Sequence, residues 1–516
     1  MKPLIVLIGT HNGFRLEGAN KFIIERQQSC PLEAILDSCK ELKNYIGGEW
    51  TNGIGEIENI NPSQTDDKVA VATQGSSADV ERAIRWAKQG QKEWETSLLE
   101  TRYDILMGIG NELIRRKNEI GYLLSREEGK PLAEGIGEVH RAGQYFTYYA
   151  AEVLRQMGES TPSTRPGVDV RVDREPLGVV GIITPWNFPI AIAAWKIAPA
   201  LAFGNSVILK PSNATPSSAH ALAEIINRHG LPKGTFNMVM GEGREVGDAL
   251  IHGDGIDGIS FTGSVETGKV IAAVCAKRMV RCQLEMGGKN PLLVMDDADI
   301  DTAVQAAFMG GFSSSGQKCT ASSRLVVARP LYDQFVTRLV DTISKVKVGH
   351  ALQEGTTMGP VIHDKARSFQ LEHIQQAVKE GATKVIGGEA LHLENNGHYL
   401  SPCLLADTHN DMTINREEIF GPVAAVIPVD DFDHGIKVVN DTDFGLTAGI
   451  ITQSMKYASE FTRRAKAGCT MVNLPTVGAD YHVPFGGRKA SSLGSREMGS
   501  YAKDFYTIVK TSYFKF

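Results

Sequence analysis

Short runs of β-branched and aliphatic residues alternate with helical segments through most of this 516-residue chain, and this alternation is what most constrains its fold. Two such runs, at residues 179–183 and 206–209, are each followed by a helical segment, at residues 191–201 and 217–229. Strands that alternate with helices in this way predict β-α-β units and therefore a parallel sheet.

The same alternation returns after residue 285. Strands are predicted near residues 291–295 and 323–327, and helices near residues 302–309 and 331–344. A chain of this length exceeds what one ordinary core holds, so two or more lobes are expected. The sequence therefore predicts an α/β fold of two doubly wound, Rossmann-like lobes, with a ligand in the crevice between them.

The region before the first buried run is predicted to contain helices. Ser77 is a suitable N-cap followed by apolar residues at helical spacing, and two more helices are predicted near residues 106–116 and 139–155. Residues 1–42 carry no long periodic pattern, so we interpret them as an N-terminal extension. The apolar run at residues 4–9 is shorter than the roughly 7–15 residues of a secretory signal and is interpreted as a short strand or a disordered extension.

Composition narrows the class of protein. Hydrophobic residues make up 42% of the chain and charged residues 22%, as in ordinary globular proteins. The formal net charge of −6 provides no basic surface for nucleic acid, and no apolar stretch approaches the ~20 residues of a membrane span. Neither nucleic acid nor a membrane is therefore expected as a partner. The seven cysteines are odd in number and show no C-x-x-C spacing, which favours free thiols in a reducing, cytoplasmic compartment and no metal site.

Cys319 is a candidate nucleophile. It follows a run of small residues at 313–316, which lets a substrate approach the backbone closely, and the neighbouring Lys318 could favour the thiolate. A buried structural cysteine is the alternative, and it is the usual one for a cysteine considered alone.

Glu285 is a candidate general base. It lies in an apolar, glycine-rich segment, where loss of hydration raises the pKa of a carboxyl group toward the range that suits a base. A surface glutamate ahead of a turn is the alternative, but Gly287 and Gly288 favour close backbone packing.

Asn187 is a candidate oxyanion donor. Two prolines and two aromatic residues surround it in the segment 185–189 and hold its side chain on a rigid loop. An amide N–H fixed in this way can donate to a developing negative charge. An ordinary asparagine in a proline-rich turn is the alternative.

These three motifs resemble the aldehyde dehydrogenase superfamily, which carries a cysteine after G-Q-x, a glutamate in E-x-G-G-K and an asparagine in P-W-N-F-P. All three occur here in the same order, and the resemblance runs from about residue 43 over more than nine-tenths of the chain. It implies that Cys319 attacks the aldehyde and that Asn187 and the Cys319 backbone N–H hold the oxyanion. Hydride then leaves to a nicotinamide, and Glu285 activates the water that hydrolyses the thioester.

Three other classes of protein fit less well. Acylating dehydrogenases, which pass the thioester to coenzyme A, usually lack the glutamate that stands here at position 285. A cysteine hydrolase needs a partner histidine, and none of the three motifs contains one. A non-catalytic, crystallin-like protein on the same fold has no structural need for all three side chains.

The resemblance implies a cofactor, NADP or NAD. The segment 241–247 differs by one residue from the glycine-rich fingerprint of dinucleotide-binding proteins, so taken alone it is weak evidence for a cofactor site. The segment 261–268 is similar to the family's phosphate-facing turn, where N–H groups at a helix N-terminus cradle a pyrophosphate. Lys210 resembles the ligand of the adenosine ribose and Glu418 that of the nicotinamide ribose. The full implied set is Ile183, Trp186, Lys210, Ser212, Asn213, Gly243, Phe261, Gly263, Ser264, Glu418 and Phe420.

One departure from the family bears on cofactor choice. Many NAD-preferring relatives place a glutamate after Lys210-Pro211-Ser212, whereas this chain has Asn213. A carboxylate there binds the ribose 2′-hydroxyl and repels a 2′-phosphate. Asn213 is therefore expected to allow NADP.

The family pattern also implies a substrate pocket lined by Arg141, Gln144, Phe188 and Trp195. A guanidinium at position 141 suits a carboxylate at the far end of the substrate, although a solvated helix face is the alternative. The segment 480–489 resembles the branch that acts on 2-oxoglutarate semialdehyde (2,5-dioxopentanoate) in sugar-acid and pentose catabolism. Broad aliphatic, succinate semialdehyde or betaine aldehyde substrates are the alternatives.

The same resemblance divides the chain and implies assembly. A strand-like run near residues 505–511 suggests an oligomerisation arm, and hence a homodimer or homotetramer. The expected division is an extension at 1–42, a cofactor-binding domain at 43–155 and 175–284, a catalytic domain at 285–490, and the arm at 156–174 and 491–516.

Overall fold

A computed structural model describes residues 39–155 and 157–516 of the chain. Residues 1–38 and residue 156 lie outside the described residues, and so does the interpretation of the run at residues 4–9. Residues 39–516 form one compact unit by their contacts. No described helix is long and apolar enough to cross a membrane.

The first large sheet has eight strands in the order β22-β12-β11-β8-β9-β10-β2-β3. The five strands from β12 to β10 run parallel, and the short strands at both edges are antiparallel to their neighbours. The bounds are β2 (Asn44–Ile46), β3 (Glu49–Thr51), β8 (Val179–Ile183), β9 (Ser206–Lys210), β10 (Phe236–Met238), β11 (Gly258–Thr262), β12 (Arg281–Glu285) and β22 (Ser492–Leu493).

The second large sheet has seven strands in the order β15-β18-β19-β14-β13-β20-β21. All its pairings are parallel except that of β15 with β18. Two sheets rich in parallel strands confirm the predicted α/β class with two lobes. The bounds are β13 (Asn290–Val294), β14 (Ser322–Ala328), β15 (Thr383–Ile386), β18 (Cys403–Ala406), β19 (Val423–Val429), β20 (Thr447–Ile451) and β21 (Cys469–Val472).

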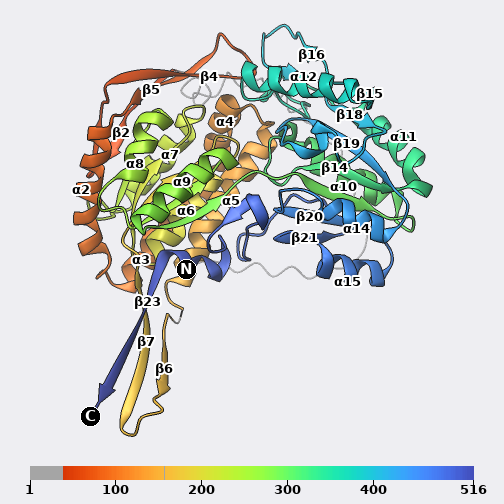
Figure 1. The fold of residues 1–516 in the computed structure, drawn as a ribbon. Helices are drawn as coiled ribbons and strands as arrows, with labels where there is room; N and C mark the ends of the chain where they lie inside the picture. Colours follow the sequence, from red (N-terminus) through yellow and green to blue (C-terminus); the bar gives the residue numbers. More distant parts are fainter. Residues whose placement is uncertain (1–38, 156) are drawn as a thin grey trace, which may run out of the picture. The chain divides into compact units, whose positions relative to one another are not determined.

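Three strands form a separate small sheet that extends away from the eight-stranded sheet (Figure 1). In it β23 pairs with β7 along nine residues, from Thr507 opposite Pro176 to Lys515 opposite Val168. This sheet comprises β6 (Glu159–Pro162), β7 (Val168–Pro176) and β23 (Thr507–Lys515). The remaining strands are β1 (Lys40–Leu42), β4 (Gly55–Ile60) and β5 (Lys68–Gln74) in one sheet, and β16 (Ala390–Leu391) with β17 (Tyr399–Leu400) in another.

Helices separate the parallel strands, as the sequence pattern predicts. They are α2 (Ser77–Trp94), α3 (Leu99–Arg115), α4 (Lys117–Glu128), α5 (Leu132–Glu152), α6 (Ala191–Ala202), α7 (Pro216–Arg228), α8 (Asp248–His252), α9 (Val265–Arg278), α10 (Ile300–Phe312), α11 (Tyr332–Ile343), α12 (Asp364–Lys379), α13 (Thr413–Arg416), α14 (Phe432–Asn440), α15 (Met455–Arg464) and α16 (Lys503–Tyr506).

Three helix predictions need correction. The N-cap of α2 is Ser76 rather than Ser77, because the Ser76 hydroxyl accepts from the Asp79 N–H in a capping box. Helices α3 and α5 begin at Leu99 and Leu132, each seven residues earlier than predicted. Helix α4 was not predicted, because buried polar residues interrupt its apolar pattern. One of them, Glu127, accepts from the Ser217 and Ser218 N–H groups and so caps α7.

The continuous apolar runs are explained by burial on both faces of the sheet. Val207 and Leu209 of β9 point into one core, while Ile208 points into a second core on the opposite face. Strands covered by helices on both sides have no polar face, so they lose the alternation of a half-exposed strand. This arrangement fixes the carboxyl ends of the central strands rigidly.

Candidate functional site

The candidate residues converge where the two lobes meet. Strands β8, β9, β11 and β12 end at residues 183, 210, 262 and 285, so their following loops lie at one edge of the first sheet. In open α/β sheets, ligands bind at this edge. The second lobe contributes Cys319, just before β14, and the segment 418–420, just before β19.

Cys319 is a shielded thiol. Burial, together with the negative charges of Glu418 and Glu285, raises the pKa of the Cys319 thiol to about 12. The expectation that Lys318 favours the thiolate stays a prediction: the opposite charges of Lys318 and Cys319 attract, while the Lys318 ammonium donates its hydrogen bond to the Ser313 hydroxyl at 2.7 Å. The thiol is therefore protonated at neutral pH until a base or a ligand changes its surroundings.

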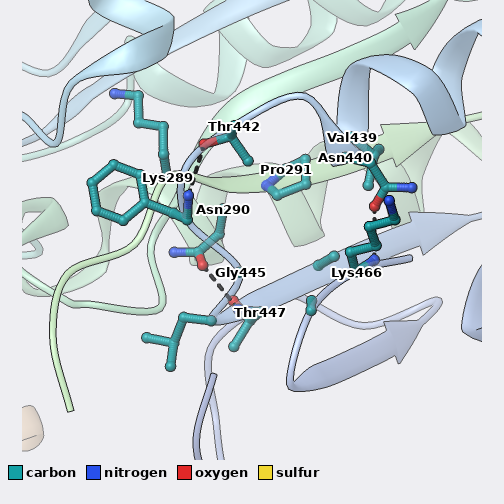
Figure 2. A pocket seen from close by; sticks show the side chains of 13 residues that line it. Lys289, Asn290, Pro291, Val439, Asn440, Thr442, Gly445, Thr447 and Lys466 are labelled. Atoms are coloured by element: carbon teal, nitrogen blue, oxygen red, sulfur yellow. Dashed lines mark hydrogen bonds between the residues drawn. The ribbon is translucent and has the colours of Figure 1, made fainter. Parts of the chain in front are cut away.

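The backbone around Cys319 is held by Asn290. The Asn290 amide donates to the carbonyl oxygens of Cys319 at 2.7 Å and Ala321 at 3.0 Å. Its oxygen accepts from the Thr447 N–H at 3.0 Å, a bond visible in Figure 2. Every hydrogen-bonding group of this side chain except one lone pair is thus used to tie the Cys319 loop to the start of β20.

The turn before Cys319 has an unusual backbone. Ser314 and Ser315 have φ angles of 50° and 53°, in the left-handed region that costs non-glycine residues energy. Gly316 follows at φ 64°, and a Cβ there would lie 2.1 Å from the Gly421 carbonyl oxygen. Only a run of small residues fits this turn, which explains the serines and glycine that precede the cysteine.

Asn187 reaches this turn from the other lobe. Its side chain is buried and donates to the Gln317 carbonyl oxygen at 3.0 Å. An amide nitrogen carries two N–H groups, so the second remains for a ligand near Cys319. The sequence analysis missed the group that fixes Asn187: the Lys130 ammonium donates to the Asn187 carbonyl oxygen at 2.7 Å and to Glu138 at 2.6 Å.

Lys130 and Glu138 are almost fully buried, each with a side-chain exposure of 1%. Glu138 also accepts from the Ile190 and Ala191 N–H groups, so it anchors the start of α6. In a sequence, charged residues of this kind look like a solvated helix face. The only local signal was the compact Glu-Gly-Lys-Pro segment that ends at Pro131.

Glu285 is buried at the end of β12, with an exposure of 3%. Burial and the nearby Glu497 raise the pKa of the Glu285 carboxyl well above its usual value. The Ser492 hydroxyl donates to its Oε2 at 2.6 Å. The carbonyl oxygen of Glu285 accepts from the Gly263 N–H at 3.1 Å, which ties the base to the turn after β11.

The glycines after Glu285 permit the close packing that the sequence suggested. A Cβ at Gly288 would lie 2.5 Å from the Cys319 carbonyl oxygen, and one at Gly287 would lie 2.1 Å from a Glu418 carboxylate oxygen. The expectation of close backbone packing here is confirmed. It brings the segments that contain Glu285, Cys319 and Glu418 against one another.

A second buried ion pair that the sequence analysis missed lies behind Glu285. The Lys196 ammonium, on α6, contacts the Glu497 carboxylate and donates to the Ser260 hydroxyl at 2.9 Å. Both charged side chains are nearly inaccessible. The two partners act on Glu285 in opposite directions: the negative charge of Glu497 raises the pKa of the Glu285 carboxyl, and the positive charge of Lys196 lowers it.

The turn after β11 has the form expected of an anion cradle. Ser264 is the N-cap of α9, and its hydroxyl accepts from the Thr267 N–H at 3.3 Å. Phe261 is buried below, and a Cβ at Gly263 would lie 2.4 Å from its ring. The first N–H groups of this 14-residue helix therefore lie at the sheet edge, next to Glu285.

Lys210 and Asn213 lie together after β9. Burial lowers the pKa of the Lys210 ammonium to about 8, and this ammonium donates to the Pro211 carbonyl oxygen at 2.9 Å. The Asn213 amide donates to the Glu242 carboxylate at 2.9 Å, so an acidic group does stand beside position 213. Ser212 accepts from the Ala214 N–H, which shapes this turn.

The remaining cofactor candidates lie on either side of this edge. Gly243 opens a short π-helical turn, and a Cβ there would meet no protein atom within 4 Å. Ile183 is the last residue of β8. Trp186 and Phe420 meet edge to face with ring centroids 5.5 Å apart.

Glu418 completes the group near Cys319. It accepts from the Gly288 N–H at 2.8 Å. Burial raises the pKa of its carboxyl to about 7. The residue after next, Phe420, has a φ of 53°, so this loop also carries backbone strain beside the site.

Two of the four candidate substrate residues, Phe188 and Trp195, pack against the same core cluster as Cys319. The other two, Arg141 and Gln144, lie on helix α5, which contributes to that cluster. The Arg141 guanidinium lies over the Tyr481 ring, 5.4 Å from its centroid. Within residues 39–155 and 157–516, no carboxylate forms an ion pair with it. Trp195 and Phe188 pack against this core, and the buried Trp195 indole N–H has no hydrogen-bond partner among the described residues. Gln144 lies one helical turn after Arg141.

Comparison with known proteins gives a consistent result. Residues 50–512 match the model of the aldehyde dehydrogenase family. The chain is 39% identical to alpha-ketoglutaric semialdehyde dehydrogenase of Bacillus subtilis over 478 residues, which cover 92% of this chain and 98% of that protein. It is 41% identical to alpha-ketoglutarate semialdehyde dehydrogenase of Haloferax volcanii over 476 residues, or 91% of this chain and 98% of the other.

The solved structures agree on the fold. The crystal structure of betaine aldehyde dehydrogenase from Staphylococcus aureus in complex with NAD+ matches with a TM-score of 0.91 and 32% identity, over 94% of this chain and 97% of that one. The match extends over both large sheets, and the candidate residues of both lobes lie within the matched range of the family. This chain therefore belongs to the aldehyde dehydrogenase family and is an oxidoreductase that acts on aldehydes.

Proposed function

We propose that the protein oxidises 2-oxoglutarate semialdehyde to 2-oxoglutarate through a thioester on Cys319, with NAD or NADP as the hydride acceptor. One observation carries the choice of substrate: the Arg141 guanidinium has an aromatic support, Tyr481, but no carboxylate partner among the described residues. A substrate with a carboxylate at the far end would supply that partner. The names of the two relatives given above support the same choice.

In this proposal Cys319 forms the bond to the aldehyde carbon. The thiol must release its proton to solvent water as it attacks, because its pKa of about 12 keeps it protonated at neutral pH. The carbonyl oxygen becomes an oxyanion that accepts from the free N–H of the Asn187 amide and from the Cys319 backbone N–H. Fixed donors of this kind stabilise the developing charge without reorganisation. NAD(P)+, when bound, accepts the hydride, and a thioester remains on the sulfur.

Glu285 then acts on water. Its carboxylate removes a proton while the water oxygen attacks the thioester carbon, and the carboxylic acid leaves as the Cys319 sulfur is regenerated. The raised pKa of the Glu285 carboxyl makes it a stronger base than an ordinary glutamate. Hydrolysis by water, rather than transfer to coenzyme A, follows from the presence of this base.

The residues at the sheet edge fit a dinucleotide. The N-terminal N–H groups of α9 suit a pyrophosphate, the open space at Gly243 leaves room for an adenosine, and the buried Lys210 offers a donor to its ribose. Glu418 would hold the nicotinamide ribose, and Trp186 and Phe420 would flank the ring. We propose that NADP is accepted as well as NAD because position 213 carries no acid, although the Glu242 carboxylate beside it opposes this effect.

The assembly and location are further parts of the proposal. Exposed apolar side chains along β23, among them Ile508, Val509 and Tyr513, support a role for the arm formed with residues 156–174 in joining subunits into a homodimer or homotetramer. The described cysteines are all free, which supports a reducing, cytoplasmic location.

A single series of assays tests the proposed function. Formation of NADH or NADPH is followed with 2-oxoglutarate semialdehyde, succinate semialdehyde, betaine aldehyde and propanal, with and without coenzyme A. We expect the highest kcat/KM for 2-oxoglutarate semialdehyde and no dependence on coenzyme A. A higher kcat/KM for propanal would reject the assignment to an aldehyde that carries a carboxylate. A strict requirement for coenzyme A would reject hydrolysis.

A further inference from the structure

Ser492 lies directly opposite Glu285 across two paired strands. Strand β22 runs antiparallel to β12, with Ser492 opposite Glu285 and Leu493 opposite Leu284. The ends of the surrounding loop are closed by two hydrogen bonds between the backbones of Phe485 and Glu497, at 2.7 and 2.9 Å. The position of residue 492 relative to Glu285 is therefore fixed by backbone pairing on both sides.

The hydroxyl of Ser492 has a defined direction. It accepts from the Gly487 N–H at 2.6 Å and lies 2.6 Å from the Oε2 atom of Glu285. A hydroxyl has one proton, and a backbone N–H is always the donor. Because Gly487 supplies its proton to the oxygen of Ser492, the proton of Ser492 is free to point at Glu285. A short O–H donor of this kind favours the ionised carboxylate as acceptor.

The two carboxylate oxygens of Glu285 differ in their hydrogen bonding. No described residue forms a hydrogen bond to Oε1, which faces Gly486. A Cβ at Gly486, where φ is +147°, would lie 2.8 Å from this oxygen. The glycine avoids a clash with Oε1 and with the Arg496 guanidinium, whose Nη1 atom would also lie 2.8 Å from this Cβ. One oxygen of the carboxylate is held by Ser492, while the other is left for a water molecule.

From this geometry we infer that Ser492 is a positioning residue for Glu285, which orients the carboxylate and supports its ionised form during hydrolysis of the thioester. The inference rests on the proposed role of Glu285 as the base. Burial and Glu497 oppose ionisation of Glu285, and the hydroxyl of Ser492 counteracts them, together with the positive charges of Lys196 and Arg496. Of these three groups only Ser492 forms a hydrogen bond with the carboxylate.

Removal of the hydroxyl should change the pH dependence of hydrolysis. In Ser492→Ala and Ser492→Gly the carboxyl of Glu285 loses a donor that favours its charged form, so its pKa should rise. We expect the acidic, ascending limb of the pH–kcat profile to move to higher pH by about one unit, and kcat at neutral pH to fall about tenfold. KM for the aldehyde and Kd for NAD+ should stay within twofold, because neither ligand contacts Ser492 in this scheme.

Two control variants make the experiment specific. Ser492→Thr keeps the hydroxyl and should restore the wild-type pH profile. Ser495→Ala removes a hydroxyl from the same loop, three residues away, where the described residues form no side-chain hydrogen bond with it, and should change nothing. Thermal denaturation of each variant separates a folding defect from a change in the base.

The outcomes distinguish the inference from the proposed function. If Glu285→Gln turns over normally, Glu285 is not the base and both ideas fail. If Glu285→Gln stalls after a burst of reduced cofactor but Ser492→Ala has the wild-type profile, the base stands and the inference about Ser492 is overturned. An equal shift in Ser495→Ala would also overturn it. A shift in Ser492→Ala and Ser492→Gly that Ser492→Thr reverses would support it.

Discussion

The segments around Cys319 and Glu285 place two reactive groups, one partly buried and one buried, by different means. Among the described residues the Cys319 thiol forms hydrogen bonds only with backbone N–H groups, those of Cys319 and Thr320. Its loop is fixed through the contacts of Asn290 with the backbone and through a strained turn of small residues. Glu285 is fixed through its own side chain, by Ser492. The nucleophile, which must form a covalent bond, is thus held without a hydrogen bond to another side chain among the described residues. The base, which must be ionised, accepts a hydrogen bond from a side-chain hydroxyl.

Replacement of the nucleophile should have the largest effect. Cys319→Ala removes the atom that bonds to the aldehyde carbon, so steady-state NAD(P)H formation should fall by at least about 10⁴-fold. Because the only hydrogen bonds of this side chain among the described residues are weak contacts with the backbone N–H groups of Cys319 and Thr320, Tm and the Kd for NAD+ should hardly change. Appreciable turnover in Cys319→Ala would remove the sulfur from the mechanism.

Replacement of the base should separate the two halves of the reaction. Glu285→Gln should slow thioester hydrolysis by about 10²–10⁴-fold and leave a burst of reduced cofactor in stopped-flow measurements. In the wild type, hydrolysis should rise with pH as Glu285 ionises, and the variant should lose this rise. Since the folded-state pKa of Glu285 is raised, ionisation costs stability as pH rises above the ordinary glutamate pKa. The Tm of the variant relative to wild type should therefore increase from pH 5 to pH 8, and a pH-independent difference would argue against this burial effect.

The third prediction tests backbone placement of the nucleophile. Asn290→Asp keeps the oxygen that accepts from Thr447 but sets a carboxylate against the carbonyl oxygens of Cys319 and Ala321. Loss of these donors should displace the loop, lower kcat about 10²-fold and reduce stability by about 1–3 kcal/mol. Kinetics and thermal denaturation measure the two effects.

Asn440→Asp is the matched control for this variant. Asn440 also bridges two backbone groups, Arg464 and Lys466, and is shown in Figure 2, but it does not contact the Cys319 loop. It should lose stability without a comparable loss of kcat. Equal losses of kcat in both variants would mean that Asn290 acts only on general stability.

The sequence predicted the lobes and the reactive residues better than the groups that hold those residues in place. The three motifs and the continuous apolar strands made the lobes and the reactive residues recognisable, because their spacing depends on local chemistry. The groups that hold Asn187 and Glu285, namely Lys130, Glu138 and Ser492, come from distant segments. A buried charged residue and an exposed one look alike in sequence, so only the fold shows which charges have lost contact with water.

Two local predictions were incomplete for a related reason. Lys318 was expected to favour the Cys319 thiolate, but its ammonium forms its hydrogen bond with Ser313 and acts on Cys319 only through its charge. Helix α4 was not recognised because its last turn buries polar residues, among them Glu127, whose partners are the N–H groups of Ser217 and Ser218. In both cases the sequence did not show which group would be the hydrogen-bond partner.

The fourth prediction concerns Arg141, at the substrate end of the site, which forms no ion pair with a carboxylate among the described residues. Arg141→Ala should raise KM for 2-oxoglutarate semialdehyde and succinate semialdehyde about 10–100-fold, because their far carboxylate loses its cation. Propanal has no such group and should be little affected. Arg155→Ala, just past the end of the same helix, removes an exposed guanidinium paired with Glu152 and serves as the control. Equal losses on charged and neutral aldehydes would make Arg141 a structural residue.

The smallest effect is expected at the cofactor ribose. Asn213→Glu adds a second acid beside Glu242, so Kd for NADP+ should rise several-fold relative to NAD+. Glu242→Gln should have the opposite effect. Equilibrium fluorescence titrations measure both constants without turnover. If neither variant alters the ratio, the 2′-phosphate does not lie near these residues.

The pairing of β22 with β12 also has a consequence for the order in which the protein matures on the ribosome. Ser492 is synthesised 207 residues after Glu285, so at roughly 5–20 residues per second the glutamate emerges about 10–40 seconds before its hydroxyl donor exists. Both lobes can collapse in that interval around their own parallel strands. The nascent chain therefore acquires its nucleophile early, and the contact that orients its base is among the last to form.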